Sequence, residues 1–175
     1  MPDARTHGRT DARTDNGGNG NGRRRLALVA SKGTLDGAYP PLILAATAAS
    51  LGWEVGIFFT FYGLDILHKK RHKKLQVAPL GNPAMPVPVP NLVGALPGMT
   101  AAATTMMRRW MKRQNLPTVP EFLGLARESG VKLFACSTTM GVMGVKAKDL
   151  LPGADIAGAT AFLDFAADAD VSLFV

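Results

Sequence analysis

Short apolar runs alternate with longer stretches of helical pattern along most of the chain. Five runs have the composition of buried strands, at residues 26–30, 53–59, 131–136, 154–158 and 171–175. Continuous apolar runs of about four to eight residues are typical of strands that are buried on both faces of a parallel sheet. The pattern therefore predicts a three-layer α/β fold, with a mostly parallel sheet of about five strands and helices on both faces.

The segments between these runs carry the signals that start and stop helices. Helices are expected at residues 36–51, 62–68, 119–129, 139–145 and 159–168, and in the second half of 99–111. Pro40 and Pro41 are expected in the first turn of the first helix, where proline is tolerated. Pro120 and Glu121 open the helix at 119–129, and Gly130 closes it.

Two segments depart from this alternation. Residues 1–24 hold almost no large apolar side chains, which predicts a disordered tail or linker ahead of one domain at 25–175. Residues 75–107 contain no charged residue and many prolines, which forbid one continuous helix. This proline-rich apolar insertion either packs on the sheet or on another subunit, or contacts a membrane. If the insertion contacts a membrane, the basic clusters at 69–74 and 108–113 would meet anionic head groups.

Charge and composition narrow the classes of function. The net charge is +7, but residues 1–25 contribute six arginines against three aspartates, and the rest comes mostly from the two basic clusters. Neither cluster has the interleaved aromatic residues of an RNA-binding sheet, so no nucleic-acid partner is expected. The spacing of cysteine and histidine predicts no metal site, and the three histidines are expected on the surface. The chain has neither a G-x-G-x-x-G nor a Walker A pattern, and we expect no cofactor.

The only cysteine, Cys136, is the candidate nucleophile. It ends the apolar run 131–136 and is followed by Ser137, Thr138 and Thr139, which favour the start of a helix. A helix N-terminus stabilises a thiolate, and ligands of parallel sheets bind where the strands end. A free thiol also suggests a reducing compartment, the cytoplasm.

Several neighbours are candidates for binding an anion or a substrate. Thr138 and Thr139 supply backbone donors, and the small, polarizable segment that begins at Met140 leaves room for a ligand. Lys32 and Gly33 follow the first strand and open on the same edge, where a lysine could steady a thiolate. Because free cysteines are often simply buried, an inert core cysteine stays open as the alternative.

The segments 131–136, 140–145, 149–154 and 158–164, together with Ser31–Asp36, resemble the DsrE/DsrF-like sulfur-carrier family. More narrowly, they resemble the DsrE-type branch labelled "peroxiredoxin family". The resemblance covers about residues 25–175, and the neighbourhood of Cys136 is its specific part. It implies a compact α/β fold. It also implies a homo-oligomer, either a trimer or an assembly of several trimers. The stretch 79–97 resembles an insertion of the membrane-associated branch, which implies a cytoplasmic protein at the inner face of a membrane.

The resemblance also implies a function. Cys136 would carry sulfane sulfur as a persulfide or a thiosulfonate and exchange it with TusA-like and rhodanese-like partners. One cysteine per subunit suffices when the partner brings the second thiol. The sequence therefore predicts a cysteine-dependent sulfur carrier or sulfurtransferase. The alternative is a non-catalytic oligomeric scaffold, or a protein at the membrane periphery, in which the cysteine is buried and inert.

Overall fold

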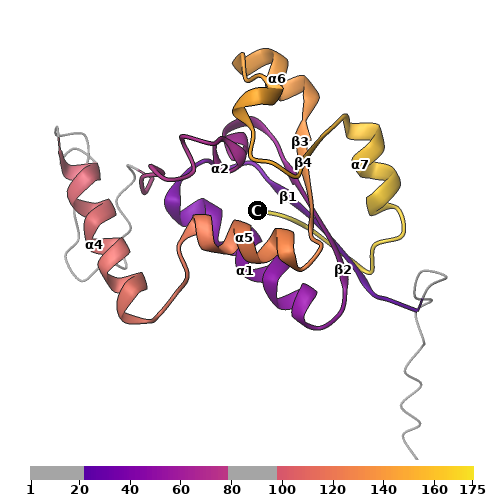
Figure 1. The fold of residues 1–175 in the computed structure, drawn as a ribbon, viewed down its shortest axis with the longest axis horizontal. Coiled ribbons are helices and arrows are strands. Elements are labelled where there is room, and N and C mark those ends of the chain that lie inside the picture. The colour runs from indigo at the N-terminus through magenta and orange to yellow at the C-terminus, as the bar shows by residue number, and fades with distance from the viewer. Residues whose placement is uncertain (1–21, 79–97) are drawn as a thin grey trace, which may run out of the picture.

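The computed structural model describes residues 22–78 and 98–175. Within these ranges, five parallel strands form a sheet in the order β4-β3-β2-β1-β5 (Figure 1). The strands are β1 (Arg25–Ala30), β2 (Glu54–Phe59), β3 (Lys132–Cys136), β4 (Ala154–Ala157) and β5 (Val171–Phe174). The predicted parallel sheet is confirmed. Most of the predicted tail at 1–24 and the prolines between residues 79 and 97 lie outside the described residues.

Six helices and two 3₁₀ turns are seen in the described ranges. They are α1 (Leu35–Ser50), η1 (Phe61–Gly63), α2 (Leu64–Leu67), α4 (Met99–Arg113), α5 (Val119–Glu128), α6 (Ser137–Met143), η2 (Ala147–Asp149) and α7 (Ala159–Ala166). The helix expected only in the second half of 99–111 occupies that whole stretch. The helix expected from residue 139 begins two residues earlier, directly after Cys136.

The start of α1 corrects one prediction. The Thr34 hydroxyl accepts the N–H of Gly37 at 3.2 Å, so the helix begins at Leu35. Pro40 and Pro41 therefore lie in its second turn and not, as expected, in its first. Proline has no N–H, so the helix lacks two of its internal hydrogen bonds there. Pro41 is fully buried, so its ring contributes to the core instead.

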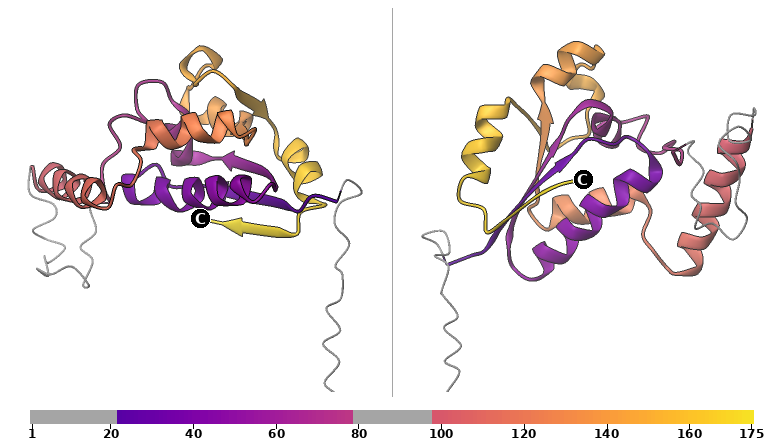
Figure 2. Two further views of the ribbon diagram at one scale, coloured as in Figure 1. Left: turned by 60° about the horizontal axis from the view of Figure 1, so that its bottom comes forward. Right: turned by 180° about the vertical axis from the view of Figure 1, so that it is seen from behind.

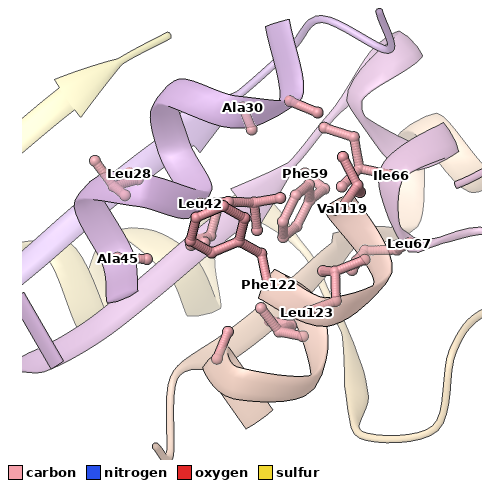
Figure 3. Packing of buried hydrophobic residues seen from close by; sticks show 14 of the residues in the cluster. Leu28, Ala30, Leu42, Ala45, Phe59, Ile66, Leu67, Val119, Phe122 and Leu123 are labelled. Atoms are coloured by element: carbon pink, nitrogen blue, oxygen red, sulfur yellow. The ribbon is translucent and has the colours of Figure 1, made fainter. Parts of the chain in front are cut away.

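The larger core lies on the face of the sheet that α1 and α5 cover. Figure 3 shows side chains of both helices packed against Phe59 and Leu28 of the sheet. Along each strand every second side chain points to this face, as the two-residue period of a strand requires. These residues include Leu26, Leu28 and Ala30 of β1, Val55, Ile57 and Phe59 of β2, and Leu133 and Ala135 of β3.

The intervening residues form a smaller, aromatic cluster under α7. Figure 1, and the view from behind in Figure 2, show α7 on the side of the sheet opposite α1 and α5. Phe58 of β2 stacks on Phe162 of α7 with ring centroids 4.8 Å apart, and Phe134 of β3 lies against Phe162 and Phe165. Cys136 lies two residues beyond Phe134, so its side chain belongs to this cluster.

An ion-pair network closes the edge of the sheet at which the strands begin. The Glu54 carboxylate accepts hydrogen bonds from Arg25 at 2.8 Å and from Lys132 at 2.7 Å. Both cations also lie over the ring of Phe165, at 4.9 and 5.0 Å from its centroid. The Lys132 hydrogen bond is the main cause that lowers the pKa of Glu54, and the Arg25 hydrogen bond adds to it, while burial opposes both. The network ties β1, β2 and β3 together where α7 ends.

We predict that Glu54→Gln lowers the free energy of unfolding by about 1 kcal/mol at pH 7, as loss of a well-formed ion pair does. Because the pKa of Glu54 is depressed in the folded state, this stabilisation is present above the carboxyl's unfolded pKa. It is lost as the pH falls through the lower folded pKa. Urea unfolding should show a difference in the free energy of unfolding between wild type and variant that is present at pH 7 and much smaller at pH 3. Asp164→Asn, which alters an exposed carboxylate on α7, is the control. An equal gap at both pH values would contradict the prediction.

Candidate functional site

Cys136 stands at the junction of β3 and α6. It is the last residue of β3 and the N-cap of α6, and it is buried, with 7% of its surface exposed. At an N-cap, a side-chain acceptor normally receives the N–H of the second or third helical residue. Here the N-cap side chain is a thiol. It makes no capping hydrogen bond by geometry, but the N–H groups of Thr138 and Thr139 act on it to lower its pKa. The sequence Cys-Ser-Thr-Thr thus places a thiol where helices usually have a hydroxyl or carboxylate.

Two threonine hydroxyls complete the surroundings of the sulfur. Thr139 comes from α6, and Thr60 directly follows β2, the strand that pairs with β3 through Phe59 and Ala135. The two hydroxyl oxygens are 3.0 Å apart, and the Phe61 N–H donates to the Thr139 oxygen at 3.2 Å. The two hydroxyls hydrogen-bond each other, so one of their two hydrogens is used between them and the other is available to the sulfur. Both hydroxyls act to lower the pKa of Cys136.

These contacts favour the thiolate form of Cys136. Burial is the largest single influence and raises the pKa of the thiol, because it removes the anion from water. The hydroxyl and N–H of Thr139, the hydroxyl of Thr60 and the N–H of Thr138 act in the other direction. Together they outweigh burial, so the pKa of Cys136 lies below its ordinary value. The lowered pKa favours the thiolate, which is the nucleophilic form of cysteine.

The loop that carries Thr60 is held by close backbone packing. Phe61 has a φ of 46°, a left-handed conformation that is uncommon for a bulky residue and that marks functional sites. A Cβ on Gly33 would collide with the backbone carbonyl of Tyr62. Only glycine therefore lets the loop after β1 lie against the loop after β2. This contact keeps the Phe61 N–H directed at Thr139.

The structure brings together most of the predicted site residues. Cys136, Thr138, Thr139 and Met140 lie at the junction of β3 with α6, although Met140 is buried. Gly33 reaches the site indirectly, through its contact with Tyr62. Its predicted role in binding an anion or substrate stays a prediction.

Lys32 lies farther from the sulfur. It follows β1, which is separated from β3 by β2, and it is exposed. Its side chain lies against Gly37 in the first turn of α1. The groups that lower the pKa of Cys136 are threonines and do not include Lys32. The role of Lys32 in balancing the thiolate charge stays a prediction.

Sequence reasoning missed Thr60. A signal was available in the sequence. Thr60 is the first polar residue after the apolar run that ends at Phe59, just as Ser137 is the first polar residue after the run that ends at Cys136. That the two strands are neighbours, with Phe59 beside Ala135, could not be read from the pattern.

Larger hollows in the described part of the molecule lie away from the sulfur. One of about 880 Å³ adjoins the segment after α2, and one of about 1040 Å³ lies between α4 and α5. Cys136 lines neither of them. Among residues 22–78 and 98–175, no cluster of three His, Cys, Asp or Glu side chains could hold a metal ion. No helix in these ranges combines the length and the apolar character needed to cross a bilayer.

Fold and site together define a parallel α/β protein with one activated thiol where its strands end. A family model described as DsrE/DsrF/DrsH-like matches residues 22–174, and the chain belongs to this family. The family resemblance found in the sequence is thereby confirmed.

Individual relatives agree with this assignment. The chain is 45% identical over 159 residues to "Sulfur carrier protein DsrE2" of Allochromatium vinosum, covering 87% of this chain and 99% of that protein. It is 33% identical over 155 residues to the uncharacterized protein YrkE of Bacillus subtilis, covering 87% and 97%. The crystal structure of YchN from E. coli superposes with a TM-score of 0.54 over 87% of this chain and 99% of that one. At 12% identity, YchN supports the fold alone.

We predict that Thr139→Val lowers the rate of iodoacetamide alkylation of Cys136 at pH 7 by up to about tenfold. A hydrogen bond to a charged group contributes about 1.5 kcal/mol or more, and its loss disfavours the thiolate. The alkylation rate followed against pH should rise at a higher pH than in wild type. Thr60→Val should act in the same direction.

Thr138→Val is the matched control for both variants. Thr138 donates its backbone N–H, which valine retains, and its side chain is exposed. Equal pH profiles for Thr138→Val and Thr139→Val would show that the hydroxyls do not activate the thiol.

We predict that Gly33→Ala destabilises the protein by about 1–3 kcal/mol, as overpacking does in a rigid contact. It should also slow alkylation of Cys136, because moving Tyr62 displaces the adjacent Thr60 and Phe61. Urea unfolding and alkylation rates measure the two effects. Gly141→Ala in α6 is the control, since a Cβ there meets no atom within 4 Å. Wild-type stability of Gly33→Ala would disprove the packing argument.

Proposed function

We propose that the protein is a sulfur carrier in which Cys136 accepts sulfane sulfur and passes it to a partner thiol. The observation that carries this proposal is the position of Cys136 at the start of α6, where donor groups of Thr60, Thr138 and Thr139 lower the pKa of its thiol. The relative named as a sulfur carrier protein, which shares nearly half of its residues with this chain, supports the same role.

Sulfur transfer by this thiol needs no outside oxidant. The Cys136 thiolate attacks the outer sulfur of a donor persulfide, R–S–SH. A new S–S bond forms, the donor S–S bond breaks, and R–S⁻ leaves. The product is a persulfide on Cys136, whose outer sulfur lies about 2 Å beyond the original one. In the second step a partner thiolate attacks that outer sulfur and regenerates the Cys136 thiolate. With tetrathionate as the donor, the thiolate attacks a sulfane sulfur, a new S–S bond forms, the central S–S bond of the donor breaks, and thiosulfate leaves, so that Cys136 carries –S–SO₃⁻.

The surroundings suit a charged sulfur species. Phe58, Phe162 and Phe165 share the cluster of Cys136 and shield one side from water. The threonine donors supply the compensation that a buried anion needs. Such a site functions as a sulfurtransferase in a relay, with TusA-like or rhodanese-like proteins as donors and acceptors.

The carrier assembles as a homo-oligomer, a trimer or a multiple of one. Large apolar side chains on the outer elements support assembly, because Ile156 on β4, Leu163 on α7 and Phe174 on β5 are all at least half exposed. Exposed apolar residues of this size suit burial at an interface.

The carrier acts in the cytoplasm at the inner face of a membrane. The uncharged stretch 75–107 runs directly into the basic cluster at 108–113, an arrangement that suits contact with anionic lipid and leaves the cluster at 69–74 free for another partner. Sedimentation with anionic vesicles distinguishes membrane contact from the other two interpretations of this stretch, which are contact with the sheet and contact with another subunit.

The burial of Cys136 favours one rival, a scaffold with an inert cysteine. The rate of alkylation of Cys136 distinguishes the sulfur carrier from the scaffold. Fast modification of the native protein near neutral pH is expected for the carrier, whereas modification only after unfolding would identify the scaffold.

We predict that the wild-type protein gains the mass of one or two sulfur atoms after incubation with polysulfide, and that dithiothreitol removes the gain. Cys136→Ser should abolish the gain, because serine forms no persulfide. Ser137→Ala should retain it, since Ser137 is exposed beside the thiol and is not among the groups that lower its pKa. Intact-mass spectrometry measures all three. A Cys136→Ser protein that still gains sulfur would refute the assignment.

A further inference from the structure

Two basic segments that are far apart in the sequence meet beside α6. The first follows α2 and contains Lys69, Lys70, Arg71 and Lys74, and the second contains Lys146 and Lys148. We call these six residues the basic surface. An antiparallel bridge between His68 and Leu150 joins the two segments. The backbone N–H of Lys69 donates to the Asp149 carbonyl at 2.8 Å, and the Lys69 ammonium donates to the Lys148 carbonyl at 2.7 Å.

The basic surface keeps an excess of positive charge. Its nearest carboxylates are Asp65, which pairs with Arg71 at 2.7 Å, and Asp149, which accepts the backbone N–H of Lys146 at 3.1 Å. Lys70 and Lys74 have no ion-pair partner among the residues that the structure describes. Six cations against two carboxylates leave a local charge of +4. Such a surface attracts an anionic partner over a distance of about 10 Å at 0.1 M salt.

The two segments border an open hollow. It is the hollow of about 880 Å³, and its lining includes Lys70, Arg71 and Lys74 together with Gly144 and the carboxylates Asp65 and Asp149. A volume of this size can admit several side chains of a partner. Its lining combines ammonium and guanidinium groups, which bind carboxylates.

The basic surface and the thiol flank the same short helix. Gly144 lines the hollow and ends α6, and Cys136 precedes its first residue. The seven residues of α6 span about 10 Å. A small anion in the hollow is therefore too far from the sulfur to react with it. A protein partner buries about 800 Å² of its own surface, a patch about 30 Å across, and so covers both.

Two exposed aromatic residues directly follow Thr60 in the loop after β2. Phe61 and Tyr62 expose 62% and 68% of their surface, and Phe61 is joined to Thr139 through its N–H. Aromatic residues are enriched at the centres of protein interfaces, and charged residues are more common at the rim. Exposed aromatic residues in this loop, together with a cationic surface, have the composition of a protein docking site.

We propose that the basic surface docks an acidic protein partner whose thiol exchanges sulfur with Cys136. This inference rests on the proposed carrier function and specifies the chemistry of its partner. The partner carries Asp or Glu side chains at one side of its reactive cysteine. A protein is favoured over a nucleic acid or a lipid surface because only a protein brings a second thiol to the site.

The test uses two synthetic peptides that differ only in charge. Each contains one cysteine activated as a thiopyridyl disulfide, flanked in one peptide by four glutamates and in the other by four glutamines. The Cys136 thiolate displaces thiopyridone and forms a mixed disulfide with the peptide, and the absorbance of the thiopyridone gives the rate. At low salt we expect the glutamate peptide to react about tenfold faster or more with the full-length protein. The advantage should vanish near 1 M salt, where the screening length is about 3 Å.

Three multiple variants locate the effect. K70Q/K74Q/K148Q should remove most of the glutamate peptide's advantage and leave the glutamine peptide's rate unchanged. K70R/K74R/K148R, which keeps the charge, should behave as wild type. R109Q/K112Q/R113Q removes the same charge from exposed positions of α4 and should retain most of the advantage.

Equal rates for the two peptides at low salt, or equal losses from the surface variant and the α4 variant, would overturn the proposal. Single-stranded DNA and phosphatidylglycerol vesicles serve as competitors. If either abolishes the advantage at a lower charge concentration than a cysteine-free glutamate peptide, the surface selects phosphate, and the proposal is wrong. If Cys136 reacts with neither peptide, the carrier function itself fails, and the docking proposal fails with it.

Discussion

The threonine donor groups around the Cys136 sulfur, which lower its pKa, are the constraint on which the site depends. Burial alone would keep the thiol protonated, and the donors of Thr60, Thr138 and Thr139 reverse that tendency. Thr60 and Thr139 belong to different strand–helix connections, so the donor set exists only when β2 and β3 lie side by side. The chemistry of this protein is therefore a property of the assembled sheet edge and not of a local motif.

The same sheet edge shields the thiol and also brings it to the first turn of α6. Alternation along β3 directs Leu133 and Ala135 toward the large core, and Phe134 and Cys136 toward the aromatic cluster under α7. The strand ends at Cys136, so its sulfur meets apolar rings on one side and the first turn of α6 on the other. A residue earlier in β3 would be enclosed by the sheet, and a residue later would belong to the exposed start of α6.

Much of this arrangement could be predicted from the sequence, and the rest depended on contacts between distant segments. The apolar runs predicted the parallel strands, and Ser-Thr-Thr after Cys136 predicted a helix at the thiol. Thr60 escaped prediction because only the pairing of Phe59 with Ala135 brings it to the sulfur. His72 was expected on the surface because it lies in a basic run. It is buried, with its ring Nδ1 2.8 Å from the His68 carbonyl oxygen.

Charge is distributed differently at the two edges of the sheet. Where the strands begin, the carboxylates of Glu54 and Asp168 pair with Arg25 and Lys132, and these ion pairs hold strands of the sheet together. Where they end, the cations near α2 and α6 outnumber their carboxylates, yet the groups that lower the pKa of Cys136 are hydrogen-bonding threonines. The threonines thus act on the pKa of the thiol, and no lysine is among the groups that shift it. Under the docking proposal, the lysines act on the partner that approaches the thiol, so a change in partner would leave the surroundings of the sulfur unaltered.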